Sequence, residues 1–401
     1  MSTLSKVVGS ATLVGGLVGA AALGGATAQR LALLRYREMG YPDTDLASLA
    51  DSAGGLGLGA LPSDRSYSVA ASDGVVLHVE EVGPPDAPLT VVFSHGWTLQ
   101  SGAWHFQRLA LSGRAGSPTS EGGDTSPDGG GPGGPSPATE PLPQLRLVFY
   151  DQRSHGRSSR AAPGRIGIDD LAEDLAAVIG TAAPAGPLVL VGHSMGGMAV
   201  MALARREPEL FADRVYGVAL LSTSASESGP RRGRWLQVNG ANPVLPLLVG
   251  MAGRYPRLVE RGRSMGRDAV WLMTRSLGFA DPKVPAPLVD YLDRMISATP
   301  MDVIADFAPA LFSHDERDAL ATLAGIPTLI AVGDADRMTP PDRSHALAEA
   351  LPDAELLVIP GAGHMAIMEA PEPIDTALRE LVLAAWTRVR HSGRHSARER
   401  A

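Results

Sequence analysis

Short apolar runs alternate with segments of helical periodicity from about Gly74 to the C-terminal region. Segments such as Ile168–Ile179 place apolar residues at helical spacing, and a terminal helix is predicted from Pro373 to about Arg388. Several of the runs are apolar throughout, which is typical of parallel strands that helices cover on both faces. The pattern predicts an α/β fold with a doubly wound, mostly parallel sheet in a domain spanning residues 65–390. The predicted strands are Val75–Val82, Leu89–Ser94, Leu145–Tyr150, Leu188–Val191, Val215–Leu221, Pro327–Val332 and Glu355–Ile359.

Two segments interrupt this alternation. Residues 112–143 are rich in Gly, Pro and Ser and lack a hydrophobic period, which predicts a disordered surface insertion, with a regulatory or docking loop as the alternative. Residues 224–324 are helix-like and predict a cap over the C-terminal edge of the sheet, where open α/β sheets bind ligands. The candidate helices in this cap are Pro246–Val259, Arg267–Leu277 and Leu288–Ile296.

The N-terminal segment 1–30 carries an uncharged stretch, residues 7–29, that is long enough to cross a bilayer as a helix. Arg30, Arg35 and Arg37 follow it, and such positive charge resists export, which favours a membrane anchor with a cytoplasmic catalytic domain. Ala26-Thr27-Ala28 has the form of a cleavage site, so a cleaved signal peptide and secretion are the alternative, with a cytoplasmic, weakly ordered leader as a third. The C-terminal residues 391–401 predict a basic, frayed tail.

Composition narrows the classes of function. The formal net charge of −8 gives no global footprint for nucleic acid, although the cap is rich in arginine between Arg231 and Arg275. One interpretation of this basic stretch is a solvated surface. The alternative is a surface that attracts anionic lipid or an acidic substrate. The chain contains no cysteine, which excludes disulfides, thiolate catalysis and cysteine-based metal sites. No metal or organic cofactor is predicted, and the oligomeric state is not predicted.

A serine between glycines follows the predicted strand Leu188–Val191. Gly192-His193-Ser194-Met195-Gly196 matches the G-x-S-x-G nucleophile elbow, in which a strained strand-to-helix turn exposes the hydroxyl. Glycines are needed because neighbouring backbone approaches this turn closely. The apolar strand before the motif and the Ala/Met-rich helical segment after it are the context that the elbow requires. The pattern predicts Ser194 as the nucleophile.

A serine nucleophile needs a base, an acid and an oxyanion site. His364 follows the last predicted strand and is the candidate base, while Asp334 and Asp336 follow the strand before it and are both candidate acids. Gly96 permits a sharp turn after Leu89–Ser94 that exposes the backbone N–H of Trp97. Together with the N–H of Met195, this group is predicted to hold the oxyanion. A core-packed Trp97 and a His95 that hydrogen-bonds the loop are compatible with that role.

Taken together, these motifs resemble the α/β-hydrolase superfamily, in its serine esterase/lipase-like branch. The resemblance covers roughly Val69 to Arg388 and places its five motifs in the family's order. The family's G-x-x-D pattern implies Asp336 as the triad acid, with Asp334 as the fallback, and it implies a structural turn at Asp151 and Arg153. The motifs are SHGW (94–97), YDQRSHGRS (150–158), GHSMGG (192–197), GDADRMTP (333–340) and GAGHMAIMEAP (361–371).

The resemblance implies acyl transfer to water through an acyl-enzyme on Ser194. Carboxylic ester hydrolysis is the expected activity. The apolar runs of the cap favour a lipid-like small-molecule ester as the substrate. Carbon–carbon bond hydrolases, thioesterases, peptidases and perhydrolases use the same triad and are the alternatives. A non-catalytic protein that binds a small ligand in the same fold is the alternative from a different class.

Overall fold

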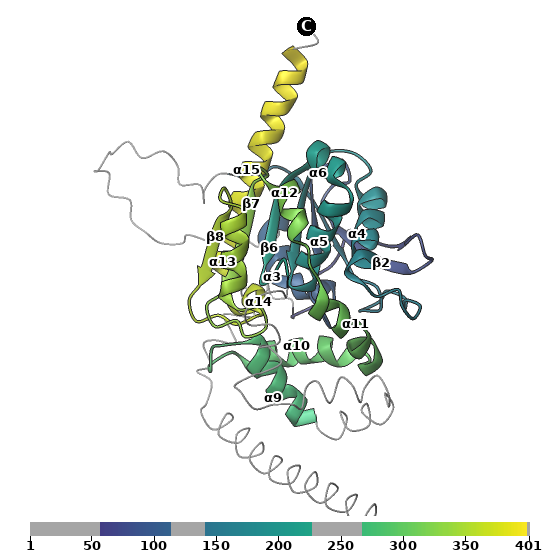
Figure 1. Ribbon diagram of the computed structural model, residues 1–401, viewed down its shortest axis with the longest axis vertical. Coiled ribbons are helices and arrows are strands. Elements are labelled where there is room, and N and C mark those ends of the chain that lie inside the picture. The colour runs from purple at the N-terminus through teal and green to yellow at the C-terminus, as the bar shows by residue number, and fades with distance from the viewer. Residues whose placement is uncertain (1–56, 114–140, 227–266, 399–401) are drawn as a thin grey trace, which may run out of the picture.

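The computed structural model describes residues 57–113, 141–226 and 267–398 (Figure 1). Within them, eight strands form one sheet in the order β1-β2-β4-β3-β5-β6-β7-β8. The pairings from β4 to β8 are parallel, whereas β2 pairs antiparallel with both β1 and β4. The predicted doubly wound, mostly parallel fold is thereby confirmed. The strands are β1 (Arg65–Ala70), β2 (Val76–Val82), β3 (Leu89–Ser94), β4 (Leu145–Tyr150), β5 (Leu188–His193), β6 (Val215–Leu221), β7 (Thr328–Gly333) and β8 (Glu355–Ile359).

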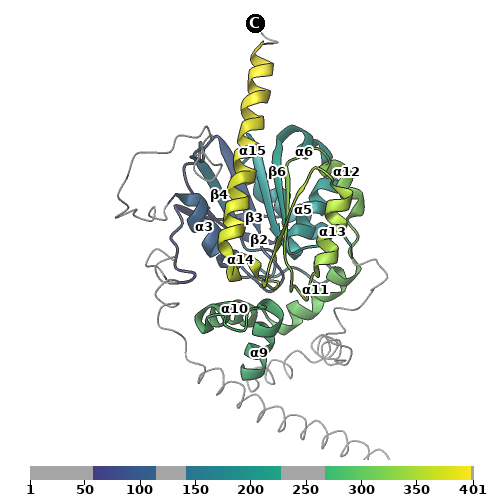
Figure 2. The ribbon, with the colours of Figure 1, turned by 90° about the vertical axis from the view of Figure 1, so that its left-hand side faces the viewer.

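Helices cover both faces of the sheet, which explains why β3, β5 and β7 are buried along their whole length (Figure 2). Along β3, Val92 packs into one hydrophobic cluster, while Val91 and Phe93 pack into the other. The first cluster includes side chains of α4 (Ile168–Ala182), α5 (Met195–Arg206), α6 (Pro208–Arg214), α12 (Leu320–Leu323) and α13 (Pro341–Ala350). The second includes side chains of α3 (His105–Ser112), α14 (Ala366–Glu369) and α15 (Pro371–Arg398).

Strand β1 was not among the predicted strands. Its side chains are mostly exposed, and Val69 is the one fully buried residue in it. A strand at the sheet edge with a solvated face shows little hydrophobic signal in a single sequence. The seven strands that were predicted all occur, with bounds that differ by at most two residues at either end.

Three described helices form the cap region beyond one end of the sheet (Figures 1 and 2). They are α9 (Arg267–Gly278), α10 (Ala286–Ala298) and α11 (Met301–Ser313), of which the sequence predicted the first two. Two short 3-10 helices complete the described elements, η1 (Ser101–Trp104) and η4 (Arg317–Ala319). The predicted helix Pro246–Val259 lies outside the described residues, as does most of the basic stretch.

In the described part of the chain, no single helix is long and apolar enough to cross a membrane. The pair α10 and α11 passes this test together, but the two helices are bent by 91° to each other. Apolar side chains of both are buried in the core clusters, for example Leu292 and Phe307. The candidate anchor at residues 7–29 and nearly all of the insertion 112–143 lie outside the described ranges.

The C-terminal residues 391–401 were predicted to be a frayed tail. The prediction is wrong for most of them, because helix α15 continues to Arg398 (Figure 1).

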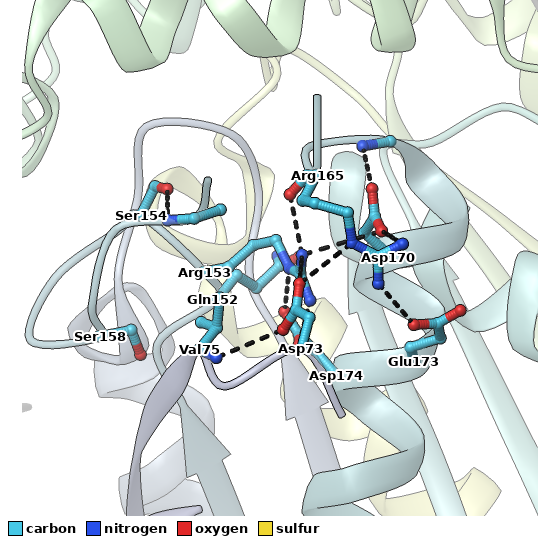
Figure 3. A network of polar contacts seen from close by, with 12 residues as sticks. Asp73, Val75, Gln152, Arg153, Ser154, Ser158, Arg165, Asp170, Glu173 and Asp174 are labelled. Carbon is cyan, nitrogen blue, oxygen red and sulfur yellow. Dashed lines mark hydrogen bonds and ion pairs between the residues drawn. The ribbon is translucent and has the colours of Figure 1, made fainter. Parts of the chain in front are cut away.

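The turn after β4 is held by a buried arginine (Figure 3). The Arg153 guanidinium donates two hydrogen bonds to the Asp174 carboxylate, at 2.6 and 2.7 Å, and both side chains are fully buried. It also donates to Asp73 at 3.0 Å and to the carbonyl oxygen of Arg165 at 2.8 Å. The network joins the turn to α4 and to the loop before β2, which agrees with the structural role expected for Arg153.

Candidate active site

Ser194 lies at the junction between β5 and α5. Its backbone adopts φ 53° and ψ −118°, a region that residues with a side chain rarely occupy. The conformation is held by neighbours, because its N–H donates to the carbonyl oxygen of Leu221 at 2.9 Å and its carbonyl oxygen accepts the Thr223 hydroxyl at 2.7 Å. The turn therefore has the strained strand-to-helix geometry that a nucleophile elbow requires.

Close backbone packing explains the glycines around Ser194. A Cβ atom on Gly196 would lie 2.0 Å from the carbonyl oxygen of Ser94, at the end of β3. A Cβ atom on Gly192 would lie 2.5 Å from the carbonyl oxygen of Gly196 itself. These positions tolerate no side chain, so the elbow can sit against β3 only with glycine on both sides of the serine.

A buried carboxylate and an imidazole meet at the ends of β7 and β8. The Nδ1 atom of His364 lies 2.9 Å from Oδ2 of Asp336, and both side chains are almost fully buried. The other carboxylate oxygen accepts the N–H groups of Met338 and Thr339, at 2.8 and 2.9 Å, and the Thr339 hydroxyl donates to Oδ2 at 2.8 Å. With Nδ1–H donating to the carboxylate, Nε2 of His364 carries the free lone pair.

Asp334 occupies a different environment. Its side chain is exposed, and its carboxylate accepts the N–H of Gly361 at 2.8 Å. The two aspartates that the sequence left as candidates are thus separated by geometry, since Asp336 contacts His364 and Asp334 caps the neighbouring turn.

The elbow and the histidine loop are in contact through His193. Its Nε2 atom lies 3.1 Å from the carbonyl oxygen of His364, and the two imidazole rings are 5.0 Å apart between centroids. In the described ranges, the Ser194 hydroxyl makes no hydrogen bond, to His364 or to any other group. Hydrogen bonds of this kind are often long before a substrate is bound. The geometry brings Asp336 and His364 together directly, and it links the elbow to them through the side chain of His193, the residue before Ser194.

The loop after β3 supplies two backbone N–H groups without acceptors. Across the described residues, the N–H groups of Trp97 and Met195 donate no hydrogen bond, so both are available to an anion. The loop passes close to the elbow, because a Cβ atom on Gly96 would lie 3.2 Å from Cβ of Ser194. Trp97 itself is half-buried and packs against one core cluster, as expected.

Two buried histidines hold this loop. Thr98, with φ 63°, donates its N–H to Nε2 of His155 at 3.1 Å. Nε2 of His95 accepts the N–H of Gln152 at 2.9 Å, so Nδ1–H of His95 donates to the carbonyl oxygen of Gly96 at 2.8 Å. Burial lowers the pKa of His155 to about 3, which keeps its Nε2 an acceptor. The supporting role of His155 was not predicted, although the residue lies within the YDQRSHGRS motif.

A cavity of about 410 Å³ lies beside the same loop, away from Ser194. It is bounded by residues of β2, η1, α3, the turn after β4 and cap helix α10. Its wall contains both apolar and charged side chains. The Arg294 guanidinium lies over the Tyr291 ring there, 5.6 Å from the ring centroid. Within the described residues, no group of three or more carboxylate or imidazole side chains could hold a metal ion. The lining includes Glu80, Gln100, Ser101, His105, Arg108, Asp151, Arg157, Tyr291 and Arg294.

Comparisons with known proteins agree with this architecture. The monoacylglycerol lipase of Mycolicibacterium smegmatis is 26% identical over 328 residues, which is 78% of this chain and 94% of that protein. The pimeloyl-[acyl-carrier protein] methyl ester esterase of Yersinia pestis is 26% identical over 287 residues, covering 70% of this chain and 88% of that protein.

Solved structures show the same fold. A thermophilic esterase from Thermogutta terrifontis superimposes with a TM-score of 0.58 at 24% identity, covering 80% of this chain and 99% of that one. A family model described as alpha/beta hydrolase fold matches residues 130–371, which is more than half of the chain. The chain therefore belongs to the α/β-hydrolase family.

Proposed function

We propose that the protein is a serine hydrolase that cleaves carboxylic esters through an acyl-enzyme on Ser194. The observation that carries the proposal is the buried Asp336–His364 hydrogen bond, 2.9 Å long, in contact with a strained serine elbow. Its supporting context is a family whose relatives are named as lipases and esterases. In this assignment Ser194 is the nucleophile, His364 the general base and Asp336 the acid that orients the base.

The proposed reaction has two stages, acylation of Ser194 and hydrolysis of the acyl-enzyme. The Ser194 hydroxyl oxygen attacks the ester carbon while its proton passes to Nε2 of His364, and the carbonyl electrons move onto the oxygen. The N–H groups of Trp97 and Met195 hold that oxyanion, a contribution of about 3–4 kcal/mol per donor in comparable sites. Collapse expels the alcohol, which takes the proton from His364. Water then attacks the acyl-enzyme by the same steps and releases the acid.

Labelling with a fluorophosphonate probe tests the nucleophile directly. The wild-type protein should be labelled and Ser194→Ala should not, and Ser222→Ala is the matched control because Ser222 is also buried with a positive φ. A folded wild-type protein that neither reacts with the probe nor hydrolyses any p-nitrophenyl ester would contradict the enzyme proposal. It would support the non-catalytic ligand-binding alternative.

The acyl group is the second part of the proposal. We infer a lipid-like small-molecule ester from the apolar runs of the cap, and the relative named as a monoacylglycerol lipase is compatible with this inference. A series of p-nitrophenyl esters of increasing chain length should show rising kcat/KM. A flat profile, or a preference for thioesters or amides, would point to one of the other serine-triad activities.

Membrane association through residues 7–29 is a further part of the proposal, with the catalytic domain on the cytoplasmic side. It is supported by the uncharged length of this stretch and by the arginines that follow it. Carbonate extraction of membranes should leave the full chain in the pellet and release a variant that lacks residues 1–30. Mass spectrometry that finds a mature start at Gln29 would instead indicate a cleaved signal peptide.

A further inference from the structure

The carboxylate of Glu369 lies where the histidine loop meets the cap. Its Oε2 atom accepts the N–H of Gly363 at 2.5 Å, and its Oε1 atom accepts the N–H groups of Ala280 and Asp281 at 2.8 and 2.6 Å. Gly363 directly precedes His364, whereas residues 280–281 connect the cap helices α9 and α10. One side chain, at the end of α14, therefore bonds two segments that are more than 80 residues apart in sequence.

The carboxyl group of Glu369 is bound by backbone groups on both of its oxygen atoms. Burial raises its pKa above the ordinary value, and the three N–H donors oppose that rise without cancelling it. In the described part of the chain, Glu369 forms no ion pair with lysine or arginine. Three N–H donors aimed at one carboxylate form a specific clamp, since each of these charge-assisted bonds is stronger than a neutral one.

The backbone around His364 is also tied to the cap and to the elbow. The N–H of Met365 donates to the carbonyl oxygen of Gly278, the last residue of α9, at 2.8 Å. A Cβ atom on Gly363 would lie 2.8 Å from the amide nitrogen of Ala280, so the loop touches the cap without side chains between them. On the other side, His193 bonds the carbonyl oxygen of His364. The position of the imidazole thus depends on cap residues 278–281 as well as on the sheet.

We propose that Glu369 is a positioning residue that couples the cap to the general base, so that residues 278–281 and His364 move as one unit. The inference rests on the proposed function, in which Nε2 of His364 must face the Ser194 hydroxyl. Loss of the carboxylate would free Gly363 and the α9–α10 connection together. A displacement of the base by about 1 Å costs about 100-fold in rate, because the reacting atoms no longer meet in a productive geometry.

Hydrogen exchange of the full chain tests the coupling without reference to activity. The variant Glu369→Ala should speed exchange in peptides that cover residues 278–284 and 360–366, both in the same variant. Glu369→Gln keeps one acceptor oxygen and should give an intermediate effect. Glu372→Ala is the matched control, because Glu372 is an exposed glutamate in the first turn of α15 and should leave both peptides unchanged.

Kinetics provide the second measurement. For Glu369→Ala, kcat on a p-nitrophenyl ester and the rate of fluorophosphonate labelling should fall about 10- to 100-fold with KM nearly unchanged. If this variant does not fold by circular dichroism, Glu369→Gln carries both measurements. Faster exchange in only one peptide, or unchanged kcat in a folded variant, overturns the proposal. A wild-type protein without any activity contradicts the proposed function instead, and the exchange result then still decides the coupling.

Discussion

Replacing Asp336 by asparagine isolates the contribution of one oxygen atom. Asp336 accepts four hydrogen bonds, of which two come from backbone N–H groups to Oδ1 and two, from Thr339 and His364, reach Oδ2. An asparagine can keep its oxygen on the backbone side, which places its NH₂ group against the His364 ring. The Nδ1 atom must then accept a hydrogen bond, so the imidazole proton moves to Nε2 and the base can no longer take the Ser194 proton.

The size of the effect follows from this change of tautomer. A base held in the wrong tautomer lowers kcat by about 10⁴-fold, which corresponds to about 5.5 kcal/mol of transition-state stabilisation. Asp334→Asn is the matched control. Asp334 is exposed and accepts a single N–H, which an asparagine oxygen can also accept, so its kcat should stay within about twofold of wild type.

The assay is the initial rate of p-nitrophenyl ester hydrolysis at saturating substrate, with thermal unfolding as a check that each variant is folded. If Asp334→Asn loses activity and Asp336→Asn keeps it, the acid is Asp334 and the assignment is wrong. If a folded Asp336→Asn variant retains more than about a tenth of kcat, the tautomer argument itself fails.

Three further predictions, each with its control or refuting outcome, concern the packing and burial of residues in the fold. Arg153→Met removes the partner of a fully buried carboxylate and should lower the free energy of unfolding in urea by about 3–5 kcal/mol, whereas adding Asp174→Leu should recover most of it; a loss below about 1 kcal/mol would contradict this. Gly196→Ala should give insoluble or inactive protein, because its Cβ would lie 2.0 Å from a backbone oxygen of β3. Gly180→Ala has open space around its Cβ in α4 and should stabilise the protein by about 0.5–1 kcal/mol, so a Gly196→Ala protein that is as soluble and as active as Gly180→Ala would refute the packing argument. Burial raises the pKa of Asp375 to about 7, above its ordinary value of 3.8, so the free energy of unfolding should fall as pH rises from about 4 to about 7. Asp375→Asn should remove that fall, and an unchanged pH profile by thermal unfolding would show that the carboxyl ionises normally.

Much of the fold was accessible from the sequence because its central strands are buried on both faces. The runs at Leu89–Ser94 and Val215–Leu221 are mostly apolar, and their bounds were predicted correctly. Strand β1 and helix α11 were not predicted, for different reasons. Only Val69 of β1 is fully buried, and α11 carries Pro309 in its interior, which usually argues against a helix.

For the candidate site, the residue pattern predicted which loops carry chemistry and left two aspartates as candidate acids, and only the family resemblance implied Asp336. Asp334 and Asp336 follow the same strand and differ only in which way each side chain faces, which depends on the turn that precedes Pro340. The hydrogen bonds that Thr98 donates to His155 and Ala280 donates to Glu369 join segments that are distant in sequence. Such contacts follow from the order of strands in the sheet and leave no periodic signal in the chain.

The buried histidines near Ser194 indicate why one imidazole can act as a base while its neighbours do not. Burial lowers the pKa of both His155 and His193 to about 3, so each stays neutral at physiological pH. Protonation of His155 would replace the acceptor that faces the Thr98 N–H by a second donor, and the loop that carries Trp97 would lose its support. Of these three histidines, His364 is the one that is hydrogen-bonded to a carboxylate. A positive charge on His364 is therefore compensated, whereas the same charge on His155 would break the loop that is proposed to hold the oxyanion.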